Sequence, residues 1–149
     1  MNELELYSIF SMTMGNTTYV ARQIIERING LKTRLDIISD AIKSSPAQKR
    51  AGKFAEIRQD ISKCSNARAA IAHTCWIAHP KYPDSLIRID AVHHPDKKPL
   101  IYKKRDFVEM ENKMKNLNAA LTELSFEIGF DIQQARERAS QRELRLRPD

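Results

Sequence analysis

A short apolar run, RAAIAHTCW from Arg68 to Trp76, contains an arginine, a histidine and a tryptophan. Cleavage of an RNA phosphodiester at neutral pH needs a proton acceptor with a pKa near 7 and a fixed positive charge beside the phosphate oxygens. Histidine supplies the acceptor and arginine the charge, so Arg68 and His73 are candidate catalytic residues. The same residues also fit a purely structural role in a helical core, and the choice depends on the elements that position them.

Arg68 falls on an apolar stripe of a predicted helix that begins after Ser45 and ends before the His79-Pro80 pair. The stripe has alternating spacings of three and four residues, as one face of an α-helix requires, and comprises Phe54, Ile57, Ile61, Cys64, Arg68, Ile71 and Cys75. This spacing predicts a core position for Arg68. Because an unpaired buried guanidinium is unstable, we expect Arg68 to meet an acid, open onto a cleft or face a second subunit.

His73 cannot simply point the same way as Arg68 on a regular helix. A step of five residues turns the two side chains about 140° apart. Three arrangements would bring them together: the Arg68 side chain curls around the helix, the helix distorts near His73, or residues of two subunits share one pocket. A second stripe beside the first comprises Asn66, Ala69, His73 and Trp76, so Asn66 and Trp76 are candidate substrate-binding residues.

Two helices are predicted before the helix that carries Arg68. The first begins at Asn2, which forms a capping box with Glu5, and ends near Gly15. The second begins at Asn16 or Thr17, ends near Lys43 and tolerates Gly30 in its interior at a cost of about 1 kcal/mol. Its apolar stripe comprises Ile24, Ile28, Leu31, Leu35, Ile38 and Ile42. The run Ser45-Pro46-Ala47-Gln48 then supplies the N-cap, first-turn proline and glutamine that open the third helix.

A β-hairpin and a last helix complete the predicted fold. LIRIDAV (86–92) and LIYKK (100–104) alternate apolar with polar residues around a Pro95-Asp96 turn, which predicts two paired strands. Asp106 opens the last helix in a capping box with Glu109. The apolar stripe of this helix comprises Met110, Met114, Leu117, Leu121, Leu124, Ile128, Ile132 and Ala135, and ion pairs on its outer face join Glu109 to Lys113 and Glu111 to Lys115.

These elements predict an all-α fold, a four-helix up-down bundle with a small β-hairpin inserted before the last helix. A length of 149 residues and a hydrophobic content of 42% suit one folded domain over residues 1–149, with a basic C-terminal tail that frays from about residue 141. No apolar run approaches the roughly 20 residues of a membrane span, and acids stand in MNELELYSIF where a signal peptide has basic residues. We therefore expect a cytoplasmic protein, with Cys64 and Cys75 as reduced core thiols.

The net charge of +6 is unevenly distributed and favours an anionic partner such as RNA. One basic cluster surrounds the second strand of the hairpin and comprises Lys97, Lys98, Lys103, Lys104 and Arg105. A second crowds the C-terminus and comprises Arg136, Arg138, Arg142, Arg145 and Arg147. The first cluster is a candidate RNA-binding surface, although a solvated face that keeps the protein soluble produces the same pattern. His93 and His94, beside Lys97 and Lys98, can also contact phosphate.

Other chemistries find little support in the sequence. Cys75 and His79 stand at helical i,i+4 spacing and could share a metal, but no acidic or cysteine cluster supplies the remaining ligands of a closed site. We identify no glycine-rich phosphate loop, serine nucleophile motif or paired carboxylates. The sequence therefore predicts neither a metal nor a cofactor.

Arg68-Ala69-Ala70-Ile71-Ala72-His73 resembles the R-x4-6-H motif of the HEPN superfamily (higher eukaryotes and prokaryotes nucleotide-binding domains), and AHTCW resembles the AH-x-x-W ending of bacterial HEPN-like proteins. ARQIIERINGLKTRLDII is similar to their long second helix, so the resemblance covers roughly Gly15 to Phe130. It implies a dimeric bundle and a metal-independent endoribonuclease that leaves a 2′,3′-cyclic phosphate. By the same resemblance, His73 is the general base on a ribose 2′-hydroxyl and Arg68 stabilises the transition state.

Three functions stay open at this point. The first is a homodimeric endoribonuclease, a toxin or defence factor with RNA as substrate and an antitoxin or other protein as partner. The second is a catalytically inactive HEPN-like dimerisation or interaction module, in which Arg68 and His73 fix helix ends. The third is an RNA-binding protein without catalysis. Ala69 stands where the family usually has a polar residue and Thr74 where it often has glycine, so the motif is compatible with all three.

Overall fold

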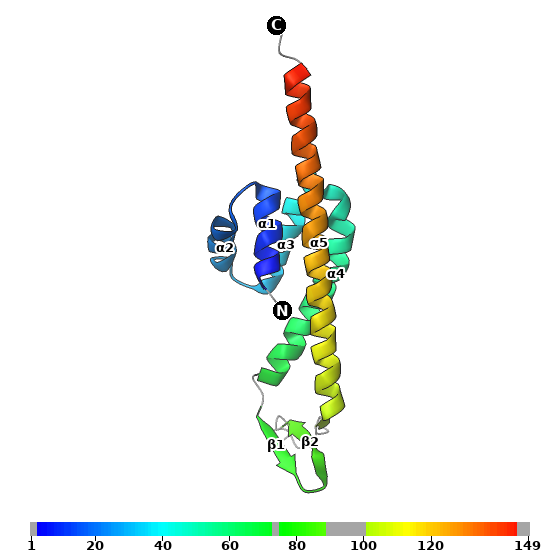
Figure 1. Ribbon diagram of the computed structural model, residues 1–149. Helices are drawn as coiled ribbons and strands as arrows, with labels where there is room; N and C mark the ends of the chain where they lie inside the picture. The colour runs from blue at the N-terminus through cyan, green and yellow to red at the C-terminus, as the bar shows by residue number, and fades with distance from the viewer. Residues whose placement is uncertain (1–2, 73–74, 89–100, 146–149) are drawn as a thin grey trace. The chain divides into compact units, whose positions relative to one another are not determined.

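The computed structural model describes residues 3–72, 75–88 and 101–145 (Figure 1). Within these ranges the chain is mostly helical and carries a small antiparallel sheet. The elements are α1 (Glu3–Met14), α2 (Thr18–Glu26), α3 (Leu31–Lys43), the 3-10 helix η1 (Gln48–Arg50), α4 (Ala51–Ala72), β1 (Trp76–His79), β2 (Tyr82–Arg88), β3 (Ile101–Lys103) and α5 (Lys104–Arg145). The predicted helical class is confirmed, whereas five α-helices stand where the sequence predicts four.

The chain forms two compact units. The first comprises Met1–Ser62 and Leu117–Asp149, and the second comprises Lys63–Asn116. The first therefore contains α1, α2, α3, η1, the beginning of α4 and most of α5, while the second contains the end of α4, the sheet and the beginning of α5. None of the helices in the described part of the chain combines the length and apolar composition of a membrane span.

The helix predicted from about Thr17 to Lys43 is wrong, because the chain breaks it into α2 and α3. Gly30 precedes α3 with φ 84°, in the left-handed region that favours glycine. Arg34 Nε donates to the carbonyl oxygen of Ile28 at 2.8 Å and so closes the connection. The break allows both α2 and α3 to pack against α1. As a result, α2 buries Ala21 and Ile25 and leaves the predicted core residue Ile24 40% exposed.

Leu35, Ile38 and Ile42 of the predicted second stripe are buried, whereas Ile28 and Leu31 are half-buried and Ile9 and Ile25 join the core from outside the predicted stripes. α1 ends at Met14, and Gly15 follows it with φ 68°, as predicted. The predicted cap at Asn2 lies outside the described residues, and Glu5 accepts a hydrogen bond from Thr122 Oγ1 of α5 at 3.2 Å. The largest fully buried side chains are Phe54, Ile9, Ile25, Leu35, Ile38, Ile42, Ile61, Leu121, Leu124 and Ile128.

A cluster of ion pairs joins η1 and the start of α4 to α5 within this unit. Asp131, whose side chain is 4% exposed, accepts from Arg50 Nε at 2.9 Å and lies 2.9 Å from Lys49 Nζ. Lys53 Nζ donates to Glu123 and to Glu127, each at 3.1 Å. The hydrogen bond from Arg50 lowers the pKa of the Asp131 carboxyl, assisted by Lys49 and opposed by burial. Asp131 is therefore a buried carboxylate that two cations keep charged.

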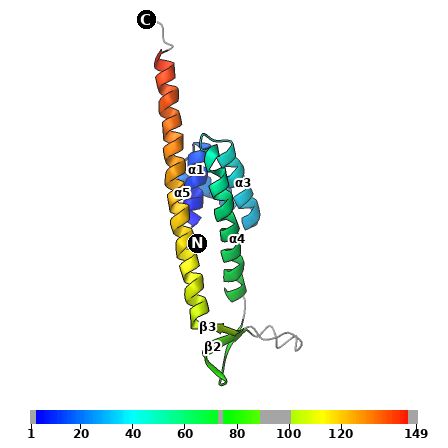
Figure 2. The ribbon, with the colours of Figure 1, turned by 90° about the vertical axis from the view of Figure 1, so that its right-hand side faces the viewer.

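In the second unit, the predicted helix past Ala72 is wrong, because Trp76–His79 forms β1. The sheet has the order β1-β2-β3, and both neighbouring pairs are antiparallel (Figure 2). The predicted hairpin pairing is confirmed where the structure describes it, since Leu86 faces Tyr102 and Ile87 faces Ile101. The third strand gives the pair the additional partner that an isolated two-stranded hairpin needs for stability.

The capping box at the start of α5 lies three residues earlier in the chain than predicted. The helix begins at Lys104, and Asp106 Oδ2 accepts a hydrogen bond from the backbone nitrogen of Lys103 at 2.7 Å. Asp106 thus occupies the third helical position and reaches back to the capping residue, which is the second half of a capping box. The predicted ion pairs Glu109–Lys113 and Glu111–Lys115 are both formed, at 2.9 Å and 2.7 Å.

Candidate functional site

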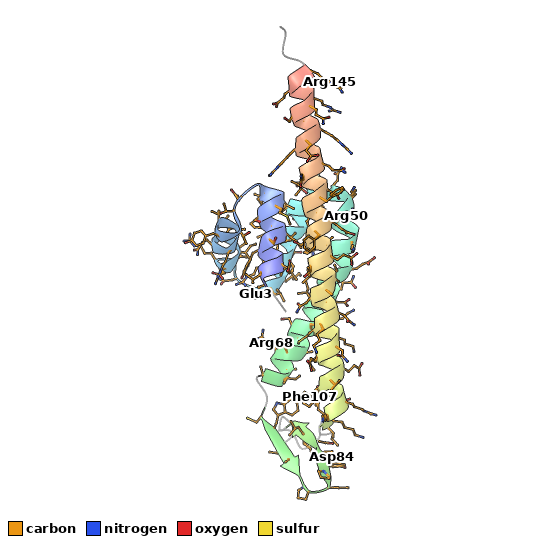
Figure 3. The ribbon with its side chains drawn as sticks, in the orientation of Figure 1. Glu3, Arg50, Arg68, Asp84, Phe107 and Arg145 are labelled. Carbon is orange, nitrogen blue, oxygen red and sulfur yellow. The ribbon has the colours of Figure 1, made fainter. Side chains whose placement is uncertain are left out.

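The candidate residues that the structure describes come from the end of α4, from β1, from β3 and from the start of α5, all in the second unit. Arg68, labelled in Figure 3, is exposed and forms no ion pair with any residue in the described ranges. The predicted core position of Arg68 is therefore wrong. Asn66, two residues earlier on α4, is also exposed.

The core stripe of α4 ends before it reaches Arg68. Ile61 is the last buried residue of the helix, and both Cys64 and Ile71 are half-buried. Cys75 is exposed, so the prediction of two core thiols is wrong for this residue. The three-and-four spacing of the stripe continues through Arg68, but the burial does not. Because a guanidinium is costly to remove from water, the exposed end of α4 suits Arg68 better than the apolar core does.

Several predicted site residues fall outside the described ranges. These are His73 and Thr74 of the motif, and Lys97 and Lys98 with the neighbouring His93 and His94. Their placement within the proposed site stays a prediction from the sequence.

Trp76 lies in an aromatic cluster with Tyr102 and Phe107. Its ring meets that of Tyr102 edge to face, with centroids 5.2 Å apart and planes at 89°, and the ring of Phe107 lies 6.1 Å away. Tyr102 and Phe107 complete the triangle at 5.9 Å. The strand register accounts for the contact, because Trp76 and Ala78 share a face with Leu86, which pairs with Tyr102. Phe107 joins from the first turn of α5.

The indole of Trp76 also caps α4. Its Nε1 donates to the carbonyl oxygen of Ile71 at 3.0 Å. Because α4 ends at Ala72, this carbonyl is among the last four of the helix and has no partner within it. Trp76 therefore supplies a partner for a carbonyl at the end of α4 that the helix itself leaves without one. The half-buried ring has its packing partners within the protein, which favours a positioning role over base stacking.

The sequence does contain a signal for this cluster. Trp76 precedes the predicted hairpin, Tyr102 lies in its second strand and Phe107 follows it, and alternation along paired strands can bring aromatic rings to one face. A helix that extends to Trp76 conceals this signal, because Trp76 can share a face with Tyr102 only when it lies in a strand of the same sheet.

Three cations lie at the junction of β3 and α5. Lys103, Lys104 and Arg105 are all exposed. Arg105 Nε is 3.7 Å from Asp106 Oδ1, a distance at which the carboxylate offsets part of the charge. Cations are unfavourable at the N-terminus of a helix because the macrodipole is positive there. A phosphate group at this junction would relieve that repulsion.

The titratable pairs on α5 in this unit are ordinary surface pairs. The hydrogen bond to Glu109 raises the pKa of Lys113, and the hydrogen bond from Lys115 lowers the pKa of Glu111. Both shifts favour the charged form, so neither group is prepared to exchange protons near neutral pH. Within the described ranges, no three side chains of His, Cys, Asp or Glu gather where they could hold a metal ion.

Comparison with known proteins adds no relative: no family model, no curated protein and no solved structure matches the chain. The likeness to HEPN proteins therefore rests on the motif residues, because the long helix predicted from about Thr17 to Lys43 is broken into α2 and α3.

Proposed function

We propose that the chain is a metal-independent endoribonuclease of the HEPN type, in which Arg68 and His73 act on one phosphodiester. The observation that carries the proposal is the state of Arg68, which is exposed and has no acidic partner among the described residues. An exposed arginine keeps its hydration and needs no internal partner. A hydrated, unpaired guanidinium five residues before a histidine is available to bind a phosphate.

The proposed reaction needs only the chain, the RNA and solvent water. The His73 imidazole takes the proton of a ribose 2′-hydroxyl, and the oxygen attacks the adjacent phosphorus. The bond from phosphorus to the 5′-oxygen breaks, that oxygen takes up a proton from water to leave as a hydroxyl, and His73 returns its proton to the solvent. A 2′,3′-cyclic phosphate forms, while Arg68 stabilises the negative charge on the phosphoryl oxygens. In this proposal the protein acts as a homodimer and serves as a toxin or defence factor.

The test is cleavage of a single-stranded RNA by the purified protein in the presence of EDTA. The expected products carry a 2′,3′-cyclic phosphate on one fragment and a 5′-hydroxyl on the other. His73→Ala and Arg68→Ala should each reduce the cleavage rate by about 100-fold or more, as loss of a general base or of a transition-state charge does. Arg27→Ala, which removes an exposed arginine from the first unit, is the matched control and should cleave as the native protein does.

Two results would overturn this proposal. One is native protein that leaves RNA intact under these conditions while remaining folded. The other is a His73→Ala variant that cleaves at the native rate, because a contaminating nuclease would then account for the activity. Circular dichroism of each variant separates loss of chemistry from loss of fold.

RNA binding without catalysis is the second candidate, and the exposed cations at the start of α5 favour it. Lys103, Lys104 and Arg105 can contact phosphates whether or not a reaction follows. In that case the native protein binds RNA with an affinity that falls as salt is added, and produces no cyclic phosphate.

A further inference from the structure

The last part of α5 continues as a helix where the core of the first unit has ended. Ile132 is the last buried residue of α5, and the helix runs on to Arg145. Between Gln133 and Glu143 only Gln134 and Ala135 are half-buried, and the other residues are exposed. Figures 1 and 2 show this segment extending past α1 and α3 of the same unit. Its surface therefore faces solvent on nearly all sides.

Three arginines form a stripe along one face of this segment. Arg138, Arg142 and Arg145 are spaced by four and three residues, which places them on one side of the helix within about 10 Å of axial rise. All three side chains are exposed. Like charges at this spacing repel one another, and the negative end of the macrodipole near Arg145 offsets only part of that repulsion.

No acidic side chain of this segment forms an ion pair with the arginine stripe among the described residues. Glu137 accepts a hydrogen bond from Gln133 at 3.0 Å, and Arg138 donates to the neutral side chain of Gln134 at 3.2 Å. Arg142 and Arg145 form no ion pair with any residue in the part of the chain that the structure describes. Three guanidinium groups are thus aligned, hydrated and available to an anion.

The composition of the segment favours a nucleic acid over a lipid surface. Helices that bind membrane surfaces place large apolar side chains opposite their basic face. From Gln133 to Arg145 the chain reads QQARERASQRELR, in which Leu144 is the one apolar residue larger than alanine, too few for an apolar face. Repeated phosphates along a strand, by contrast, match a row of planar forked donors without any apolar contact.

We propose that Arg138, Arg142 and Arg145 bind the phosphate backbone of single-stranded RNA. The contact is independent of base sequence, because it involves phosphates alone. That the nucleic acid is RNA rests on the proposed function, whereas the arginine stripe itself does not.

The experiment compares two triple variants with the native protein. Arg138, Arg142 and Arg145 are each changed to glutamine, which keeps the helix propensity and removes three charges. The matched control changes Arg22, Arg27 and Lys32 to glutamine, three exposed cations of the first unit that lie on or beside α2 and α3. Binding of a 2′-O-methyl RNA, which cannot be cleaved, is measured by fluorescence anisotropy from about 50 mM to about 200 mM salt.

The stripe variant should bind RNA about 100-fold more weakly near 100 mM salt, and its plot of log K against log salt should be shallower by about 2, since each phosphate contact contributes about 0.7. The control variant should retain the native slope. Equal loss in both variants would overturn the proposal, because net charge alone would then explain binding. An unchanged slope in the stripe variant would overturn it as well.

The same measurements separate this proposal from the proposed ribonuclease. Native cleavage together with an unchanged slope in the stripe variant rejects the stripe and leaves the enzyme. Absence of cleavage together with a shallower slope rejects the enzyme and leaves the stripe as an RNA-binding surface. Binding to vesicles that contain phosphatidylserine, lost in the stripe variant while RNA binding is absent, would assign the stripe to a membrane surface and overturn the proposal.

Discussion

Asp131→Asn tests whether the buried ion pair at the start of α4 stabilises the first unit. The substitution keeps the size of the side chain and removes its charge. The Asp131 side chain is 4% exposed and accepts from Arg50 Nε at 2.9 Å, so the variant exchanges a charged acceptor for a neutral amide beside a guanidinium. Lys49 contributes less than Arg50, because its side chain is 64% exposed and water screens part of the attraction.

The expected cost is about 2 kcal/mol of unfolding free energy, within the range for a hydrogen bond to a charged group in a partly buried position. For a chain of this size that corresponds to a fall in Tm of about 4 to 8 °C. The assay is urea unfolding followed by circular dichroism at pH 7 and at decreasing pH. Asp40→Asn is the control, because the Asp40 side chain is 72% exposed and its partner Lys43 is 59% exposed. The control should stay within about 0.5 kcal/mol of the native protein.

The pH dependence of the difference identifies its origin. The pKa of Asp131 is lower in the folded protein than in the unfolded chain. The ionised carboxylate therefore stabilises the fold at any pH above its pKa in the unfolded chain, about 3.9. This stabilisation is lost as the pH falls through the pKa of the folded protein. The gap between the native protein and Asp131→Asn should therefore be largest at pH 7 and shrink below about pH 4. A variant as stable as the native protein at pH 7, or a gap that does not change with pH, would refute this reasoning.

Two further predictions concern packing in each unit. Trp76→Phe should lower the free energy of unfolding by about 1 kcal/mol, because it keeps the ring contacts and loses the hydrogen bond to the Ile71 carbonyl oxygen. Trp76→Ala should lower it further, because the ring contacts are lost as well. Unfolding is followed by circular dichroism, since both variants remove the single tryptophan and its fluorescence. Equal losses in the two variants would mean that the aromatic packing contributes nothing. Gly52→Ala should stabilise the protein by about 0.5 to 1 kcal/mol in urea unfolding, because a new Cβ there meets nothing within 4 Å. Gly129→Ala should lack this gain, because its Cβ would lie 3.0 Å from Met12 Sδ, and an equal gain at both positions would contradict the packing.

Local pattern accounted for most of the helices. The apolar stripe of α5 correctly predicts that Leu117, Leu121, Leu124, Ile128 and Ile132 are buried, because a helix of 3.6 residues per turn keeps such residues on one face wherever it packs. The i,i+4 ion pairs on this helix are equally local and are formed as predicted. The paired segments of the hairpin follow from alternation along each strand.

The candidate site could be predicted only in part. The sequence identifies Arg68 by its residue type and its distance from His73, and nothing in the helical spacing reveals that the core stripe ends at Ile61. Trp76 was expected on a helix, whereas its place in the sheet depends on pairing with β2 and on the rings of Tyr102 and Phe107. Such contacts join residues far apart in the chain, and no local spacing encodes them.

The sequence by itself determined which segments have a helical or alternating apolar face, because that property depends on neighbours within a few residues. Tertiary structure decided where those segments end and which charges they bury. Gly30 is compatible with a helix interior, but packing of α2 and α3 on α1 made it a break. In the sequence, Asp131 stands beside the apolar stripe of α5 and could equally be a surface acid. Its burial as a carboxylate is stable only because Arg50 and Lys49 approach it from a distant part of the chain.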